Sequence, residues 1–257
     1  MTVIIPARYA STRLPGKMLL TVGDKPLIVN TLRQAEKAAL VSRVIVATDD
    51  KRIYDAVTVN GGEAVMTSPG HATGSDRIAE VAAGLPEGTV IINVQGDEPI
   101  ISPRTIDRAA EAILSGENID IVTTCERIDD LRDILSPDVV KVVTDRDGFA
   151  LYFSRSPIPF PREAVNRSGS IEAARSQDSE LVGSFRKHTG IYVYRREFLL
   201  ELCRLPQTVL EKTEMLEQLR ALENGFRIKV VEVEDRSIGV DTPEDLERVR
   251  RMVELNG

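Results

Sequence analysis

Cysteine, tryptophan and aromatic residues are scarce in this sequence. Cys125 and Cys203 are the only cysteines among 257 residues, and they form no C-x-x-C motif and no Cys/His cluster. This argues against a disulfide framework and a structural zinc site. Tryptophan is absent and aromatic residues make up 4% of the chain, which argues against a surface that stacks single-stranded bases.

The sequence also lacks a basic excess and a long apolar run. Its 33 Lys and Arg stand against 40 Asp and Glu, a net charge of -7, which argues against a general electrostatic binder of nucleic acid. No run approaches the length of a membrane-spanning helix, and no basic segment precedes the first apolar run, Val3–Ile5. We therefore expect a cytoplasmic protein with no membrane insertion and no nucleic-acid partner.

The patterning that is present favours an α/β fold. Short β-branched runs alternate with helical patterns, which is typical of βαβ units and a mostly parallel sheet. Strands are expected at 3–6, 44–48, 64–67, 90–94 and 119–124, and helices at 27–39, 51–59, 76–83 and 103–114. The length favours a single domain over two.

The pattern changes after residue 137. Residues 139–144 and 149–153 predict a hairpin, and the polar stretch 162–179 is interpreted as a mobile loop or partner-facing insertion. The remaining elements are expected as a strand at 187–194, helices at 197–202 and 212–224, a strand at 228–233 and a final helix capped by Thr242. These features predict one domain over 1–257 with an insertion at about 137–200.

A basic loop follows the first strand. Arg8, Arg13 and Lys17 lie there with hydroxyl residues and a glycine. Ligands of open α/β sheets bind beyond the carboxyl ends of the strands, and these side chains suit phosphate oxygens. The loop is not a P-loop, because Ser11 stands where the first glycine belongs, and there is no G-x-G-x-x-G. A solvated basic turn is the alternative.

Two carboxylates are expected at strand ends near the same edge. Asp97 comes just after the strand at 90–94, and Asp241 follows the strand-like segment 238–240. Together they are suited to hold Mg²⁺ against triphosphate oxygens. The alternatives are a turn residue for Asp97 and a helix cap for Asp241. Asp49 and Asp50 are interpreted as an N-cap pair before the next helix.

Motifs in order along nearly the whole chain resemble one known family, the 3-deoxy-manno-octulosonate (Kdo) cytidylyltransferases. The motifs are I-P-A-R-Y-A-S-T-R-L-P-G-K at 5–17, A-T-D at 47–49, G-S-D-R at 74–77, N-V-Q-G-D-E-P at 93–99, L-Y-F-S-R at 151–155, H-T-G-I-Y at 188–192, E-M-L-E-Q-L-R at 214–220 and G-V-D-T-P-E-D-L at 239–246.

The resemblance implies a three-layer α/β/α nucleotidyltransferase sandwich with a small arm used in a homodimer. It implies the reaction of CTP with Kdo to give CMP-Kdo and diphosphate, with Mg²⁺, for lipopolysaccharide biosynthesis. An 8-amino-Kdo cytidylyltransferase shares much of this pattern, so the exact sugar acid stays open. A cytidylyltransferase that acts on sialate is a further alternative. A non-catalytic nucleotide-binding protein is the other class.

The resemblance also implies roles for individual residues. The catalytic residues would be Arg8, Arg13, Lys17 and Asp97. Nucleotide binding would involve Ala7, Arg8, Ser11, Arg13, Lys17, Thr73, Gly74, Ser75, Asp76 and Arg77. Sugar-acid contacts would come from Gln95, Arg155, His188, Tyr192, Glu214 and Gln218, and the metal ligands would be Asp97 and Asp241. Glu211, Glu214 and Glu217 recur every three residues, and at least one of them is expected on a solvated helix face.

Overall fold

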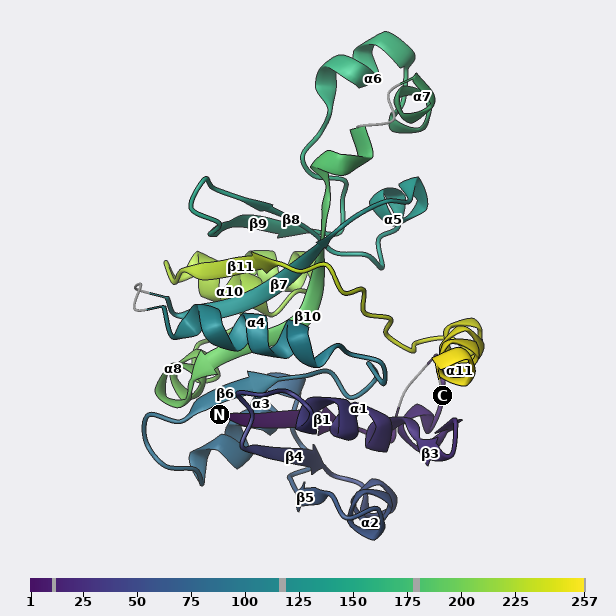
Figure 1. Cartoon of the computed structure of the whole chain (residues 1–257). Coiled ribbons are helices and arrows are strands. Elements are labelled where there is room, and N and C mark those ends of the chain that lie inside the picture. The colour runs from purple at the N-terminus through teal and green to yellow at the C-terminus, as the bar shows by residue number, and fades with distance from the viewer. Residues whose placement is uncertain (11–12, 116–118, 178–180, 257) are drawn as a thin grey trace. The chain divides into compact units, whose positions relative to one another are not determined.

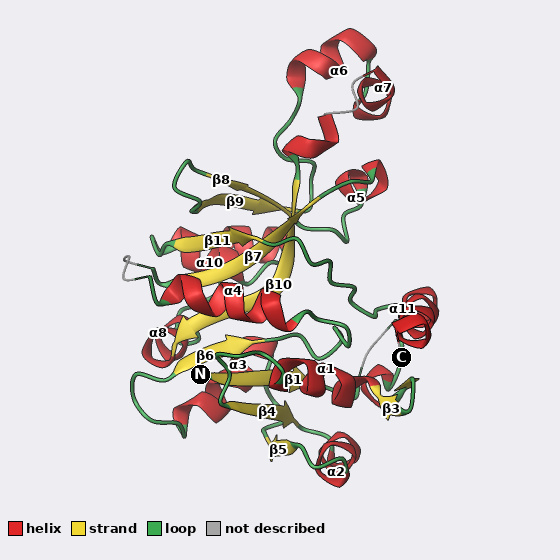
Figure 2. Ribbon diagram, in the orientation of Figure 1, coloured by secondary structure: helices red, strands yellow, loops and turns green. Residues whose placement is uncertain are grey.

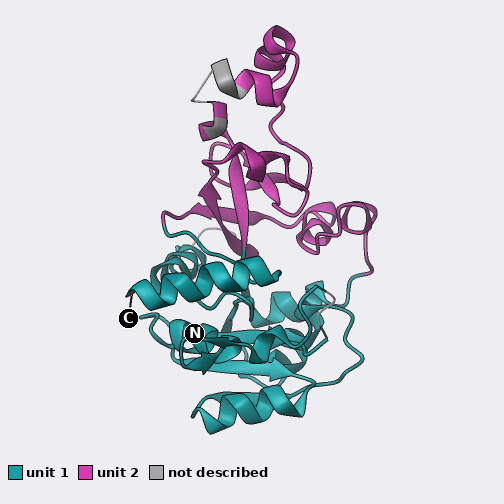
Figure 3. Cartoon of the chain, turned by 90° about the vertical axis from the view of Figure 1, so that its right-hand side faces the viewer, with its two compact units in different colours: residues 1–115, 190–205, 235–257 teal, residues 116–189, 206–234 magenta. Residues whose placement is uncertain are grey.

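The chain forms two compact units. The computed structural model describes residues 1–10, 13–115, 119–177 and 181–256 (Figure 1). Unit 1 comprises residues 1–115, 190–205 and 235–257, and unit 2 comprises 116–189 and 206–234 (Figure 3). The second unit therefore begins before the insertion expected at about 137–200 and includes a further segment of the chain. Within the described ranges, no helix has the length and apolar character needed to cross a bilayer.

Unit 1 is built on a mostly parallel sheet, as the sequence predicts. Its strands are β1 (Thr2–Ala7), β4 (Arg43–Thr48), β5 (Glu63–Met66), β6 (Val90–Asn93) and the end of β10 (Arg186–Arg195). Strand β1 pairs in parallel with β4 and β6, β4 pairs in parallel with β5, and β10 runs antiparallel to β6. The side chains of Val3, Ile4 and Ile5 are fully buried, which requires cover on both faces of the sheet.

Unit 1 also contains helices. They are α1 (Leu27–Glu36), α2 (Lys51–Val59), α3 (Gly74–Ala83), α4 (Pro103–Ile113), α8 (Arg196–Leu202) and α11 (Pro243–Asn256). Figure 2 shows α1 in front of the sheet and α3 behind it; α1 contacts α2 and α4, and α3 contacts α8. The short elements η1 (Lys17–Leu19), β2 (Thr21–Val22) and β3 (Lys25–Pro26) follow the first loop.

Unit 2 contains its own strand pairs. Strand β11 (Ile228–Glu232) is parallel to β7 (Ile121–Arg127), and β8 (Lys141–Thr144) forms the predicted antiparallel hairpin with β9 (Ala150–Ser154). The helical segments are α5 (Leu131–Leu135), α6 (Arg162–Ser168), α7 (Ile171–Gln177), η2 (Leu181–Ser184), α9 (Val209–Glu214) and α10 (Gln218–Glu223). Phe185 packs with Ile128 and Ile134 in a small buried cluster.

The loop expected at 162–179 and the single helix expected at 212–224 are wrong. The polar stretch 162–179 forms helices α6 and α7 up to residue 177, and its last two residues lie outside the described ranges. Helix α6 ends at Gly169, whose φ of 92° suits a glycine at a helix C-terminus. The single helix expected at 212–224 is two helices, because Met215 has a φ of 55° and ends α9.

Candidate functional site

Lys17 lies at the centre of the candidate site in unit 1. Its Nζ is 2.6 Å from Asp97 Oδ2, 2.8 Å from Asp241 Oδ1 and 3.0 Å from the carbonyl oxygen of Val240. The residue is 7% exposed. Burial by itself would lower the pKa of Lys17, but the two carboxylates outweigh it and raise that pKa above its ordinary value. The side chain therefore stays an ammonium ion and joins two carboxylates that are far apart in the sequence.

A glycine sets the position of Lys17. Gly16 has a φ of 68°, which a residue with a side chain adopts only with strain. A Cβ atom on Gly16 would also come 3.1 Å from the ring of Tyr9. The N–H of Gly16 donates to the carbonyl of Tyr9, which closes the first loop. The turn at Gly16 thus places Lys17 at the start of η1, facing the carboxylates.

Asp97 and Asp241 reach Lys17 from two loops. Asp97 follows β6, as expected, and the N–H of Val240 donates to its backbone carbonyl. The strand-like segment 238–240 before Asp241 does not form a strand. Asp245, rather than Asp241, completes the cap of α11, because its carboxylate accepts the N–H of Thr242. The carboxylate of Asp241 is therefore available to Lys17.

The two arginines of the first loop have different contacts. Arg13 Nη2 is 3.0 Å from Asp241 Oδ2, in an exposed ion pair. Arg8 Nη2 donates instead to the carbonyl oxygen of His71, at 2.9 Å, and so ties the first loop to the segment before α3. Ser11 lies outside the described residues. The structure therefore brings Arg13 and Lys17 to the same carboxylate and places Arg8 at another loop.

The predicted nucleotide segment forms the start of α3. Thr73 is the N-cap, and its hydroxyl accepts the N–H of Asp76 while the Asp76 carboxylate accepts the N–H of Thr73. Gly74 and Ser75 occupy the first turn. Ala7 ends β1 and is almost fully buried. These residues form a capped helix start, whose N–H groups are the kind that bind anions.

Arg77 differs from its neighbours because its side chain is fully buried. Its guanidinium donates to Asp49 Oδ2 at 2.7 Å and to the hydroxyl of Thr67. It therefore connects α3 to the ends of β4 and β5. Of the Asp49–Asp50 pair, only Asp50 caps α2. The interpretation of Asp49 as a cap is wrong; its position after a strand was the one sequence signal for this contact.

Two residues of the predicted sugar-acid set lie in unit 1. Gln95 Nε2 donates to the carbonyl oxygen of Gly190 at 3.2 Å. Tyr192 stacks on Tyr194, with ring centroids 6.0 Å apart, and its backbone pairs with Asn93 of β6. Tyr192 thus lies on β10, and Gln95 lies in the loop just after the adjacent strand β6.

His188 belongs to unit 2. Its Nε2 lies 2.8 Å from the hydroxyl of Thr123, and its ring packs edge-on against Phe153 with centroids 5.0 Å apart. Burial lowers the pKa of His188 to about 3. The imidazole is therefore neutral at neutral pH and is suited to hydrogen bonding rather than to charge neutralisation.

The low pKa of His188 predicts a pH dependence of stability. The unfolded chain takes up a proton near pH 6.5 and the folded chain does so only near pH 3, so His188 destabilises the fold as the pH falls below 6.5. Its contribution changes by at most ~1.4 kcal/mol per pH unit. Between about pH 7 and pH 5, we expect the melting temperature of the wild type to fall more steeply than that of His188→Gln, because the unfolded chain takes up the proton in this range. Equal slopes in thermal melts would contradict the assignment.

Arg155 and Glu214 contact each other in unit 2. The carboxylate of Glu214 accepts the N–H of Arg155 at 2.9 Å and the hydroxyl of Ser154 at 2.7 Å. The Arg155 guanidinium donates to the carbonyl oxygens of Glu214 and Pro137, at 2.7 and 2.8 Å. Both side chains are held in place by several bonds. The role of Ser154 was not predicted, although it is the residue next to Arg155.

The glutamate stripe does not form a solvated helix face. Glu211 is buried in an ion pair with Arg220, and Glu214 and Glu217 are half-buried. The expectation fails because α9 ends at Glu214 and Glu217 is the N-cap of α10, so the three residues do not share one helix. Gln218, at the start of α10, is 5% exposed, and its Nε2 has no hydrogen-bond partner among the residues that the structure describes.

The donor set around Lys17 fits a divalent cation. Two carboxylates already converge on one positively charged atom, and their side chains are 26% and 41% exposed, which leaves room for substrate oxygens and water. Magnesium prefers one or two carboxylates together with phosphate and water. No group of three or more His, Cys, Asp or Glu able to hold a metal ion occurs in the described ranges, so a metal ion here would need oxygen atoms from the substrate.

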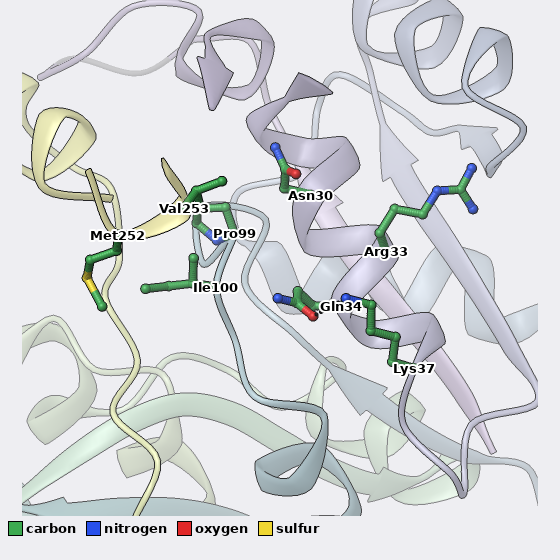
Figure 4. Close-up of a pocket in the computed structure, with 8 residues that line it drawn as sticks. All are labelled: Asn30, Arg33, Gln34, Lys37, Pro99, Ile100, Met252 and Val253. Atoms are coloured by element: carbon green, nitrogen blue, oxygen red, sulfur yellow. Dashed lines mark hydrogen bonds between the residues drawn. The ribbon is translucent and has the colours of Figure 1, made fainter. Parts of the chain in front are cut away.

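A separate cavity of about 440 Å³ lies elsewhere in unit 1 (Figure 4). Asn30, Arg33, Gln34 and Lys37 line one side of it, and Met252 and Val253 of α11 line another. Arg33 pairs with Glu36, and Lys37 donates to Gln34. None of the predicted site residues lines this cavity.

The chain matches known proteins over its whole length. The family model described as cytidylyltransferase matches residues 2–231. A 3-deoxy-manno-octulosonate cytidylyltransferase from Trichlorobacter lovleyi is 53% identical over 256 residues, with 97% of each chain covered. A protein of the same name from Geobacter sulfurreducens is 51% identical over 249 residues, again with 97% of each chain covered.

Solved structures agree with these relatives. A structure of CMP:2-keto-3-deoxy-manno-octonic acid synthetase complexed with CTP superposes with a TM-score of 0.88 at 39% identity, over 100% of this chain and 99% of that one. A nucleotidyl transferase from Methanothermobacter, 16% identical with a TM-score of 0.62 over 100% of this chain and 98% of its own, shares the fold. The chain therefore belongs to the 3-deoxy-manno-octulosonate cytidylyltransferase family of cytidylyltransferases.

Proposed function

We propose that this protein transfers CMP from CTP to 3-deoxy-manno-octulosonate, giving CMP-Kdo and diphosphate. The observation that carries the proposal is the likeness, over the full chain, to a synthetase of CMP-Kdo complexed with CTP. The names of the relatives at about half identity agree with it. The basic first loop and the Lys17–Asp97–Asp241 cluster supply the charged groups that such a transfer needs.

In this reaction the 2-hydroxyl oxygen of the sugar acid attacks the α-phosphorus of CTP. The bond from the α-phosphorus to the bridging oxygen breaks as the new P–O bond forms. Diphosphate leaves, and the hydroxyl proton passes to solvent. Transfers of this kind depend on positioning and charge neutralisation more than on covalent catalysis. We assign charge neutralisation on the triphosphate to Arg8, Arg13 and Lys17, and nucleotide contacts to Ala7, Ser11 and 73–77.

Asp97 and Asp241 are the proposed ligands of Mg²⁺. When bound, the ion would offset phosphate charge and lower the pKa of the attacking hydroxyl. The contribution of this chain is to hold the two carboxylates at one point, which Lys17 does in the protein alone. Arg13 adds a second cation at Asp241.

Contacts to the sugar acid are proposed for Gln95, Tyr192, Arg155, His188, Glu214 and Gln218. Among the described residues, the buried Gln218 Nε2 is a donor with no hydrogen-bond partner. We further propose a cytoplasmic homodimer that supplies lipopolysaccharide biosynthesis.

The test measures diphosphate release from the purified protein with Mg²⁺. CTP is combined with Kdo, 8-amino-Kdo or sialate, and Kdo is then combined with each of the four nucleoside triphosphates. We expect release to be fastest with CTP and Kdo. Faster release with 8-amino-Kdo or sialate would assign another sugar acid, and CTP binding without release would contradict the enzymatic function.

A further inference from the structure

Lys141 is a fully buried lysine in unit 2 that no predicted role includes. Its side chain is 0% exposed at the start of β8. Its Nζ donates to three backbone carbonyl oxygens: Val139 at 2.6 Å, Ser136 at 2.9 Å, and Arg155. An ammonium group has three N–H donors and no acceptor. The three carbonyls therefore require the charged form and use all of its donors.

Burying the charge of Lys141 costs folding free energy. In the described part of the chain, no carboxylate lies within ion-pair distance of its Nζ. The charged groups around it are Glu214 and Asp133, which favour the ammonium, and Arg155, which opposes it. Burial and Arg155 together lower the pKa of Lys141. An apolar side chain of similar length would avoid this cost, so the gain from Lys141 must lie in what its bonds hold in place.

The hydrogen bonds of Lys141 hold the backbone on both sides of the Arg155 guanidinium. Ser136 and Val139 flank Pro137, whose carbonyl accepts the Arg155 guanidinium. Lys141 thus fixes both the loop that carries this acceptor and the backbone of Arg155 itself.

Glu214 is connected to the same point. The register of the β8–β9 hairpin places Lys141 opposite Ser154, and Ser154 donates to Glu214. The backbone N–H of Arg155 donates to the other oxygen of the same carboxylate. The ammonium of Lys141 is therefore connected, through the backbone and hydrogen bonds, to two side chains that are proposed to contact the sugar acid.

We propose that Lys141 is a positioning residue of the sugar-acid site, acting through Arg155 and Glu214. The inference rests on the proposed function, because it takes these two side chains as contacts of the sugar acid. Lys141 itself is too deeply buried to touch a substrate. Its removal should leave the loop 136–139 and Arg155 free to move, and should weaken sugar-acid binding without affecting CTP.

The test compares steady-state kinetics of the wild type and Lys141→Met. We expect the KM for the sugar acid to rise about tenfold, as for the loss of bonds to a charged group, with the KM for CTP changed less than about twofold. Lys141→Gln, which keeps an N–H donor and removes the charge, should lie between the two. Lys229→Met is the matched control, since Lys229 is a half-buried lysine of the same unit that also donates to a backbone carbonyl, that of Asp147.

A double-variant cycle separates positioning from general destabilisation. In an Arg155→Met background, Lys141→Met should raise the sugar-acid KM by less than about twofold more, because the group through which it acts is already gone. Provided that the wild type is active, either of two results would overturn the proposal. One is an equal rise in the KM for the sugar acid and the KM for CTP. The other is full additivity of Lys141→Met and Arg155→Met in the KM for the sugar acid. A wild type that does not turn over Kdo would instead overturn the proposed function. If Lys141→Met does not fold, Lys141→Gln gives the same comparison.

Discussion

Replacing Asp97 by asparagine is expected to reduce kcat by about 100- to 1,000-fold, the range observed when a single electrostatic stabiliser is removed from an active site. The substitution keeps the size of the side chain and removes the charge that faces Lys17 at 2.6 Å. Only one carboxylate, that of Asp241, would then remain to balance the ammonium of Lys17 and to act as a proposed ligand of Mg²⁺. The measurement is diphosphate release at saturating CTP and sugar acid, over a series of Mg²⁺ concentrations.

Asp55→Asn is the control for this variant. Asp55 pairs with Lys51 on the exposed surface of α2, so its loss should change kcat by less than about twofold. Raising the Mg²⁺ concentration should recover part of the activity of Asp97→Asn if the carboxylate binds the ion. Turnover close to that of the wild type at ordinary Mg²⁺ concentrations would rule out Asp97 as a metal ligand.

Replacing Arg220 by methionine is expected to destabilise unit 2 by about 3–5 kcal/mol. Arg220 Nε is 2.8 Å from Glu211 Oε2, and the two side chains are 8% and 3% exposed. Burial by itself would raise the pKa of Glu211, but Arg220 and the N–H of Thr208 outweigh it and lower that pKa. Without Arg220, a carboxylate is left buried with its strongest partner missing. The melting temperature should fall by about 10 °C.

The double variant Arg220→Met with Glu211→Leu tests the cause of this loss. An apolar pair of similar size often replaces a buried ion pair with little loss of stability, so most of the melting temperature should return. If the double variant were as unstable as the single one, packing around Arg220 rather than the unpaired charge of Glu211 would be responsible. Calorimetry on the full chain gives both values.

The parallel sheet of unit 1 could be predicted because its strands are buried on both faces. Continuous apolar runs such as Val3–Ile5 mark such strands directly, and the start of α11 was visible in Thr242 and Pro243. The division of residues 212–224 into two helices could not be predicted. It depends on a left-handed backbone at Met215, which is not a residue that favours this conformation.

The candidate site was partly visible in the sequence. The rule that ligands bind at strand ends brought Lys17, Asp97 and Asp241 together as candidates, and the structure joins them at Lys17. The burial of Arg77 could not be predicted, because an arginine in the first turn of a helix is usually exposed. Its contacts with Asp49 and Thr67 depend on how α3 packs against two strands.

The order of segments along the chain has a consequence for how the enzyme comes into being. The chain passes from one unit to the other after residues 115, 189, 205 and 234, so neither unit is one continuous stretch. Lys17 is made early in synthesis, Asp97 later, and Asp241 only within the last segment of unit 1. A ribosome-bound chain that stops between residues 97 and 241 would carry the cationic loop with Asp97 but without Asp241. With the role proposed for Asp241, catalytic competence is therefore acquired only once residue 241 has been made, and neither unit can be produced alone by simple truncation.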